Sequence, residues 1–318
     1  MDTRLPWIIL IVYILSLLLL DFFVLHKRNK PSTIKKAIFE TIFFVSNALL
    51  FSGILYWLYA NGYVDNLNNL SPYQAFLKYL TGYMVELSLS VDNLFVIAVI
   101  FASFKIPNQY QHKLLFLGIL GALVFRGILI SLGLLLMKKF HSMSIIFGLF
   151  LLFTAIKMLK KEAEHKEEDP SKGIMRFFRL SKVLDGGKFI TKSNGKKVLT
   201  ALGGALLTIE FTDLLFALDS IPAILSITTD PFIVYSSNIF AIMGLRSLYF
   251  FLANMLDRFA YLKYSVFSIL IFVSMKLMTA SYFEIPEWFS LLFIAISLGV
   301  GIYISTLNIE KTDNTNKH

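Results

Sequence analysis

The sequence contains no cysteine, which excludes disulfide bonds, thiolate metal sites and cysteine-based catalysis. Charged residues are also scarce, at 16% of the 318 residues, whereas 56% are hydrophobic. A soluble domain of this size balances its apolar content with a charged surface, and this chain has too few charges to do so. The composition therefore indicates an all-α integral membrane protein.

Recognisable catalytic motifs are missing too. The sequence has no HExxH, no GxSxG and no nucleotide-binding loop, so we expect neither an enzyme nor a bound cofactor. The histidines lie in predicted loops or at the tail, which makes them poor candidates for metal ligands: His26, His112, His141, His165 and His318. The net charge of +9 resides mainly in loops beside apolar segments. This placement favours the anionic inner face of a membrane over nucleic acid as the partner.

Long apolar runs recur along the chain, and each can cross about 30 Å of hydrocarbon as a helix. Backbone groups in lipid must satisfy their own hydrogen bonds, which favours helices. The first run, Leu5 to Leu25, has no small-residue cleavage site and is predicted to be retained. We predict about nine spans: 5–25, 38–60, 77–104, 113–137, 143–159, 199–226, 232–253, 261–280 and 287–307.

The polar segment 160–198 is predicted to be a basic cytosolic loop, with an amphipathic helix around Met175 to Val183. Lysines and arginines are concentrated in this loop and after the first span. The connections 61–76, 227–231 and 281–286 contain neither residue. The positive-inside rule then places the N-terminus outside and the C-terminus in the cytosol.

Two stretches of the sequence repeat the same charged pattern. In both, two acids are six residues apart, and an arginine and then a lysine follow in the next two spans: Glu86, Asp92, Arg126 and Lys157 match Asp213, Asp219, Arg246 and Lys276. The third to fifth spans would thus match the sixth to eighth. Because three is odd, the second copy must be inverted, as in many secondary transporters.

This repeat divides the chain into five predicted parts. They are two N-terminal helices (1–76), a first three-helix repeat (77–159), the cytosolic loop (160–198), a second three-helix repeat (199–280), and a last helix with its tail (281–318).

Five acids lie inside two spans: Glu86, Asp92, Glu210, Asp213 and Asp219. An acid at the centre of a membrane helix costs roughly 2.5–3.5 kcal/mol on insertion scales, so a compensating partner is needed. The partners are either the bases Arg126, Arg246, Lys157 and Lys276 or a bound cation. A purely structural role, in which these bases tie the bundle together, is the alternative to an ion pathway.

Helical spacing groups these residues further. Glu86, Ser90 and Asn93 share one stripe of a helix, and Asp213 and Ser220 share another. Asp92 and Asp219 point roughly 120° away from them. All can meet at one site only if the helices are bent or broken there, by a kink at Pro222 in one span and a break around 88–92 in the other.

Carboxylate, amide and hydroxyl oxygens are hard ligands that suit Mg²⁺, Ca²⁺ and Mn²⁺. Na⁺ and protons remain alternatives at this stage. The predicted metal ligands are Glu86, Asp92, Asn93, Glu210, Asp213, Asp219 and Ser220.

Three strings around these residues resemble the TerC family of membrane proteins. They are VELSLSVDNLFVIAVIF at 85–101, EFTDLLFALDSIPAI at 210–224 and DPFIVYSSNIFAIMGLRSLYF at 230–250, and the resemblance covers Tyr79 to Met278. It implies a protein of the bacterial inner membrane that exports manganese, with the acids of each repeat forming one half of a cation site. Tyr83 stands where the second repeat has Glu210, so the two half-sites are unequal.

The sequence therefore predicts a secondary transporter whose two repeats rock about a midplane carboxylate site. The predicted substrate is Mn²⁺, and the simplest hypothesis is that it is exchanged for protons. The predicted partners are the divalent metal ion and the lipid bilayer. The alternatives are a Ca²⁺/H⁺ transporter and a membrane-protein assembly factor that acts through the cytosolic loop. The oligomeric state is left open.

Overall fold

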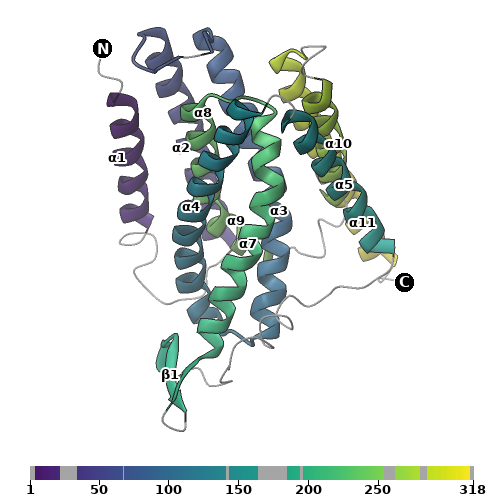
Figure 1. Ribbon diagram of the computed structural model, residues 1–318. Coiled ribbons are helices and arrows are strands. Elements are labelled where there is room, and N and C mark those ends of the chain that lie inside the picture. The colour runs from purple at the N-terminus through teal and green to yellow at the C-terminus, as the bar shows by residue number, and fades with distance from the viewer. Residues whose placement is uncertain are drawn as a thin grey trace.

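The computed structural model describes residues 4–21, 34–66, 68–140, 143–163, 185–193, 196–253, 262–279 and 285–315. These residues form a helical bundle with one β-hairpin (Figure 1). The helices are α1 (Leu5–Leu20), α2 (Ile34–Ala60), α3 (Pro72–Ser103), α4 (Asn108–Lys139), α5 (Met143–Ala163), α7 (Ala201–Leu225), α8 (Pro231–Met243), α9 (Leu245–Ala253), α10 (Leu262–Thr279) and α11 (Glu287–Thr315). The hairpin pairs β1 (Ile190–Ser193) with β2 (Lys196–Leu199) in antiparallel register.

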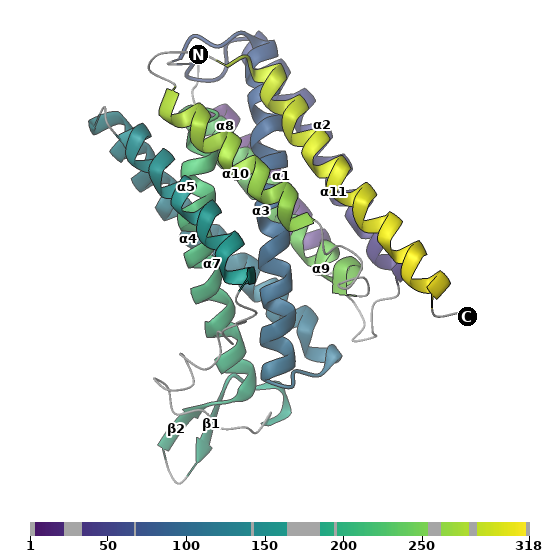
Figure 2. The same cartoon turned by 90° about the vertical axis from the view of Figure 1, so that its right-hand side faces the viewer.

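The long helices α3, α4 and α7 form the centre of the bundle. α4 packs along α7, and α3 packs against both α7 and α8. Helices α1 and α2 lie on one flank, and α5, α10 and α11 lie together on the other (Figures 1 and 2). The centre is therefore built from α3 and α7, which carry the predicted acids, and from α4, which carries Arg126.

Within the described residues, every predicted span coincides with helical structure, with one difference. The span 232–253 is divided at Gly244 into α8 and α9. Among the described residues, four helical segments are long and apolar enough to cross a membrane: Lys35–Ala60, Asn108–Lys139, Ala201–Leu225 and Trp288–Ser305. The protein is therefore a helical membrane protein, and the count of nine spans stays a prediction.

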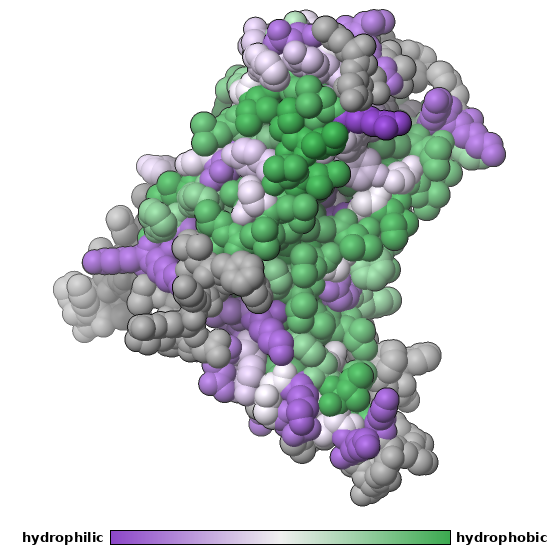
Figure 3. Space-filling view, turned by 90° about the vertical axis from the view of Figure 1, so that its left-hand side faces the viewer, coloured by the Kyte–Doolittle hydropathy of each residue, from purple (hydrophilic) through white to green (hydrophobic). Residues whose placement is uncertain are grey.

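Large apolar side chains cover the outside of the bundle. Examples from four helices are Leu15, Phe39, Leu50, Leu135 and Tyr303. Figure 3 shows apolar side chains over much of the middle of one face, with hydrophilic side chains gathered around its lower end. A surface of this kind is stable in contact with lipid rather than water.

The contacts between helices follow the proposed repeat. If α3, α4 and α5 correspond to α7, α8–α9 and α10, the packing of α4 on α7 corresponds to that of α3 on α8. The contact of α5 with α7 likewise corresponds to that of α10 with α3. This pairing is what a pseudo-two-fold relation requires; the inverted repeat itself stays a prediction.

The helices are more regular than the sequence analysis expected. α3 is a continuous α-helix from Pro72 to Ser103, so the predicted break around 88–92 is wrong. No proline interrupts this helix, and the hydroxyl of Ser88 bonds back to the Val85 carbonyl inside its own turn at 2.7 Å. α7 is one helix that includes Pro222, and the kink at this proline stays a prediction.

The β-hairpin was not predicted, although Asn-Gly at 194–195 between two short β-prone runs is a strong hairpin signal. The hairpin joins the start of α7 through Thr200, whose Oγ1 donates to the Lys188 carbonyl at 2.7 Å and accepts from the Gly203 amide at 3.2 Å. Lys113 on α4 donates to the Gly187 carbonyl at 3.2 Å. The predicted amphipathic helix at 175–183 lies outside the described residues.

Candidate functional site

A buried charge network at the centre of the bundle joins four helices. Its hub is Arg126 on α4, which is only 1% exposed and is the one charged residue in the sequence between positions 114 and 137. An arginine at this depth is costly unless anionic groups accept its hydrogen bonds. The network is therefore built around its guanidinium group.

Two carboxylates from different helices meet this guanidinium. Nη1 forms a close ion pair with Glu86 Oε1 on α3. Nη2 and Nε donate to the two oxygens of Asp213 on α7 at 3.0 and 3.3 Å. Nη1 also donates to the hydroxyl of Ser220, two turns further along α7, at 3.3 Å. Arg126 thus clamps α3 and α7 onto α4.

Polar side chains complete the network around each carboxylate. Ser90 donates to Glu86 Oε1 at 3.0 Å, and Asn238 on α8 donates to Glu86 Oε2 at 2.9 Å. Asn93 donates to Asp213 Oδ1 at 3.4 Å. Asn238 was missed by the sequence analysis, although a polar Ser-Ser-Asn run inside an apolar span was a usable signal.

The network carries more negative than positive charge. Among the side chains that the structure describes here, two carboxylates share one guanidinium, which leaves a surplus of one carboxylate in this cluster. Glu210, one turn before Asp213 on α7, adds another carboxylate. Its oxygens pack against Gly121 of α4, where a Cβ atom would approach them to 2.1 Å. No described residue donates a hydrogen bond to its buried Oε2.

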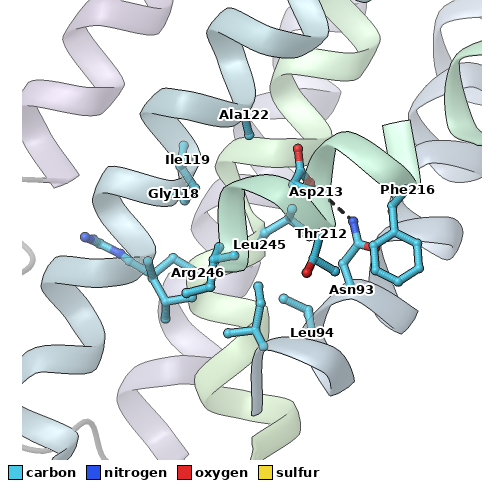
Figure 4. Close-up of a pocket in the computed structure, with 13 residues that line it drawn as sticks. Asn93, Leu94, Gly118, Ile119, Ala122, Thr212, Asp213, Phe216, Leu245 and Arg246 are labelled. Atoms are coloured by element: carbon cyan, nitrogen blue, oxygen red, sulfur yellow. Dashed lines mark hydrogen bonds between the residues drawn. The ribbon is translucent and has the colours of Figure 1, made fainter. Parts of the chain in front are cut away.

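A small cavity borders the network between α3, α4, α7 and α9. Its volume is about 40 Å³, and its polar lining includes Asn93, Asp213 and Arg246, with Thr212 beside them (Figure 4). The remaining lining is mostly apolar. A cavity of this size with several polar partners can hold a water molecule or a small ion.

Two of the predicted bases bind partners outside this hub. Arg246 extends away from Asp213 (Figure 4) and forms a close ion pair with Asp21 at the end of α1. Lys276 is buried and donates to Ser290 of α11 at 2.9 Å. Asp219 is half-buried on α7. The side chains of Asp92 and Lys157 lie outside what the structure describes.

The structure thus brings together Glu86, Asn93, Asp213 and Ser220 with Arg126. Among the described residues, no group of three or more acids and histidines is already arranged to hold a metal. The position between Glu86 and Asp213 is occupied by the guanidinium group. A cation that uses both carboxylates must therefore compete with Arg126.

Comparisons with known proteins place the chain among membrane proteins. The family model described as "Integral membrane protein TerC family" matches residues 71–313. An uncharacterized membrane protein of Myxococcus xanthus is 40% identical over 95% of this chain and 92% of its own length. An uncharacterized membrane protein of Rickettsia conorii is 40% identical over 97% of this chain and 99% of its own.

A third relative carries a functional name. The "Putative membrane-bound redox modulator Alx" of Escherichia coli (strain K12) is 38% identical over 97% of this chain and 94% of its own. No solved structure was found to match the chain.

Proposed function

The chain belongs to the TerC family of integral membrane proteins, and from that premise we propose that it is a secondary transporter that exports Mn²⁺. The observation that supports this most is the surplus of buried carboxylate around Arg126. Glu86 and Asp213 share one guanidinium group, and Glu210 lies one turn away. Intramembrane carboxylates with incomplete compensation mark ion pathways.

The chemistry of the available ligands favours a hard divalent cation. Carboxylate, amide and hydroxyl oxygens surround the cavity side of the network, and the sequence offers no thiol. Mn²⁺, Mg²⁺ and Ca²⁺ accept such oxygen sets, whereas Zn²⁺ and Cu⁺ prefer nitrogen or sulfur. Mn²⁺ is chosen among them because the acidic strings resemble those of a family associated with manganese export.

The site also connects the elements that would have to move. Glu86 is on α3, Arg126 on α4, Asp213 on α7 and Asn238 on α8, so the network ties the first proposed repeat to the second. When a cation replaces the guanidinium, these ties change together. This coupling supports alternating access by relative motion of the repeats.

Export of a divalent cation against an inside-negative potential requires a driving force. Moving one elementary charge against 100 mV costs about 2.3 kcal/mol, so Mn²⁺ export must be coupled to a favourable process, and exchange for another cation is the simplest one. Protons that bind the same carboxylates are the simplest partner. We expect transport in vesicles to stop when a protonophore removes the pH gradient, and transport that continues unchanged would exclude proton exchange.

The name of the relative Alx suggests a redox role for that protein. A thiol–disulfide mechanism requires cysteine, and this chain has none. The proposal for this chain therefore includes no thiol–disulfide step.

The proposal is tested by measuring cellular manganese in a manganese-sensitive bacterial strain under a manganese challenge. The native protein should lower cell Mn²⁺, and Glu86→Gln and Asp213→Asn should abolish the effect at equal expression. Asp185→Asn is the matched control, because this acid lies beside the β-hairpin and bonds to Thr191 at 2.7 Å. Unchanged manganese with the native protein would contradict Mn²⁺ export. A parallel calcium measurement then separates a calcium transporter from an assembly factor.

A further inference from the structure

Asn238 occupies an unusual position beside the charge network. It is fully buried, at 0% exposure, in the middle of α8. Its Nδ2 donates to Glu86 Oε2 at 2.9 Å. Its Oδ1 is equally buried, and no residue that the structure describes donates a hydrogen bond to it. The side chain therefore holds Glu86 with one end and leaves an acceptor open at the other.

An open acceptor of this kind needs a physical reason. Leaving a buried polar atom without a partner costs about 1–3 kcal/mol, and such atoms are rare in folded proteins. The neighbouring Ser236 and Ser237 avoid this cost by donating to carbonyls of α8 itself at 2.6 and 2.7 Å. Asn238 alone of these three residues is directed at the charge network.

Asn93 repeats this arrangement on the other carboxylate. It is buried on α3, its Nδ2 donates to Asp213 Oδ1 at 3.4 Å, and its Oδ1 has no donor among the described residues. Each carboxylate that Arg126 holds is thus accompanied by one amide oxygen with an open lone pair. Each of these oxygens belongs to an amide group whose nitrogen donates a hydrogen bond to a carboxylate that would bind the cation.

We propose that Asn238 is a ligand of the transported cation and that its neutral oxygen determines which metals the site accepts. This rests on the proposed function. When the guanidinium of Arg126 withdraws, Glu86 and Asp213 supply two negative charges, which match one divalent cation. Asn93 and Asn238 then add two oxygens without adding charge. Such a set suits a hard cation that takes six or more oxygen ligands.

A residue that only positions Glu86 would behave differently from a ligand. Asn238→His replaces the oxygen by a nitrogen donor, which should raise Zn²⁺ affinity relative to Mn²⁺. Asn238→Asp keeps an oxygen but removes the amide donor to Glu86. A ligand tolerates this change for Mn²⁺ binding, whereas a positioning residue does not, because Glu86 would lose a donor and face a like charge.

The test measures Mn²⁺ and Zn²⁺ affinity by calorimetry on the full chain in detergent, for the native protein and for Asn238→His, Asn238→Asp and Asn238→Leu. Ser236→Ala is the control, since this buried serine donates to carbonyls of α8 itself. Asn238→Leu should lower Mn²⁺ affinity by about ten-fold or more, and Asn238→His should move the Mn²⁺/Zn²⁺ ratio toward Zn²⁺ by at least a similar factor. Ser236→Ala should change neither value.

The outcomes separate this inference from the transport proposal. If all three Asn238 variants lower both affinities by the same factor, Asn238 only positions Glu86 and the inference is overturned. Should Asn238→His fail to fold, the Asn238→Asp variant still decides, because lost Mn²⁺ binding excludes a ligand role. A native protein that binds neither Mn²⁺ nor Ca²⁺ overturns the proposed function itself.

Discussion

Replacing Arg126 by glutamine should increase the affinity of the protein for Mn²⁺ while it lowers the stability of the metal-free protein. In the structure the guanidinium stands between Glu86 and Asp213, in the place that a bound cation would take. A cation must therefore displace Arg126 in the native protein. In the variant the same carboxylates are open.

The size of both effects follows from the burial of the three groups. Removing one partner of a buried ion pair costs about 3–5 kcal/mol, because the remaining charge is left uncompensated. The metal-free variant should lose stability of this order. The gain in Mn²⁺ affinity cannot exceed this free energy. At 1.4 kcal/mol per factor of ten, a gain of about 3 kcal/mol corresponds to about 100-fold tighter binding.

A thermal-shift assay on purified protein measures both effects. With a chelator present, Arg126→Gln should unfold at a lower temperature than the native protein. With Mn²⁺ at 100 times the dissociation constant of the variant, binding should return about 2.7 kcal/mol. At the same Mn²⁺ concentration the native protein binds more weakly and gains less, so the shift caused by Mn²⁺ should be larger in the variant. Calorimetry should give the tighter binding of the variant directly.

Two control variants separate competition from general damage. Arg126→Lys keeps a positive charge and should bind Mn²⁺ with nearly native affinity. The double variant Arg126→Gln/Glu86→Gln should regain stability, because it removes one buried charge of each sign, but it should bind Mn²⁺ weakly. If Arg126→Gln binds Mn²⁺ no more tightly than the native protein, the guanidinium does not compete with the cation and the reasoning fails.

Three further sets of substitutions test features of the bundle. Gly121→Ala places a methyl group 2.1 Å from the carboxylate of Glu210 and should reduce Mn²⁺ export. Gly127→Ala on the same helix meets nothing within 4 Å and should leave export intact. Equal export by both variants would contradict a role for the packing of Glu210 on Gly121. Thr200→Ala removes the cap of α7 and should lower stability by about 1 kcal/mol, seen as a lower unfolding temperature. Asp21→Asn and Arg246→Gln should each destabilise the protein by about 3–5 kcal/mol, and the double variant should recover part of the loss; additive losses would show that the two side chains are not coupled.

The positions of the helices could be predicted from the sequence because each follows from a run of apolar residues long enough to cross the membrane. The run around Arg126, for example, is apolar on both sides for about three turns, and α4 covers it entirely. The grouping of Glu86 with Asn93, and of Asp213 with Ser220, also follows from helical spacing. Local periodicity determines which side of a helix a residue occupies, and the structure places these residues in one network.

The partners of the buried charges could not be predicted in the same way. The repeat pattern paired Arg126 with Arg246 and so suggested equivalent roles, but Asp21 lies outside both repeats. A long side chain reaches whichever acid the tertiary packing places nearby, and sequence spacing carries no information about that distance. Asn238 was overlooked for a related reason, since its importance comes from Glu86 on another helix.

The ion pair between Asp21 and Arg246 has a consequence for how the chain is made. The two residues are 225 positions apart, so at roughly 5–20 residues per second a ribosome adds the arginine about 11–45 s after the aspartate. An unpaired arginine raises the cost of inserting α9 into lipid, and a waiting carboxylate at the end of α1 lowers it. We therefore expect α9 to insert more efficiently when α1 is still close to the translocation machinery as Arg246 arrives. The first helix would then assist the insertion of a helix that is synthesised much later.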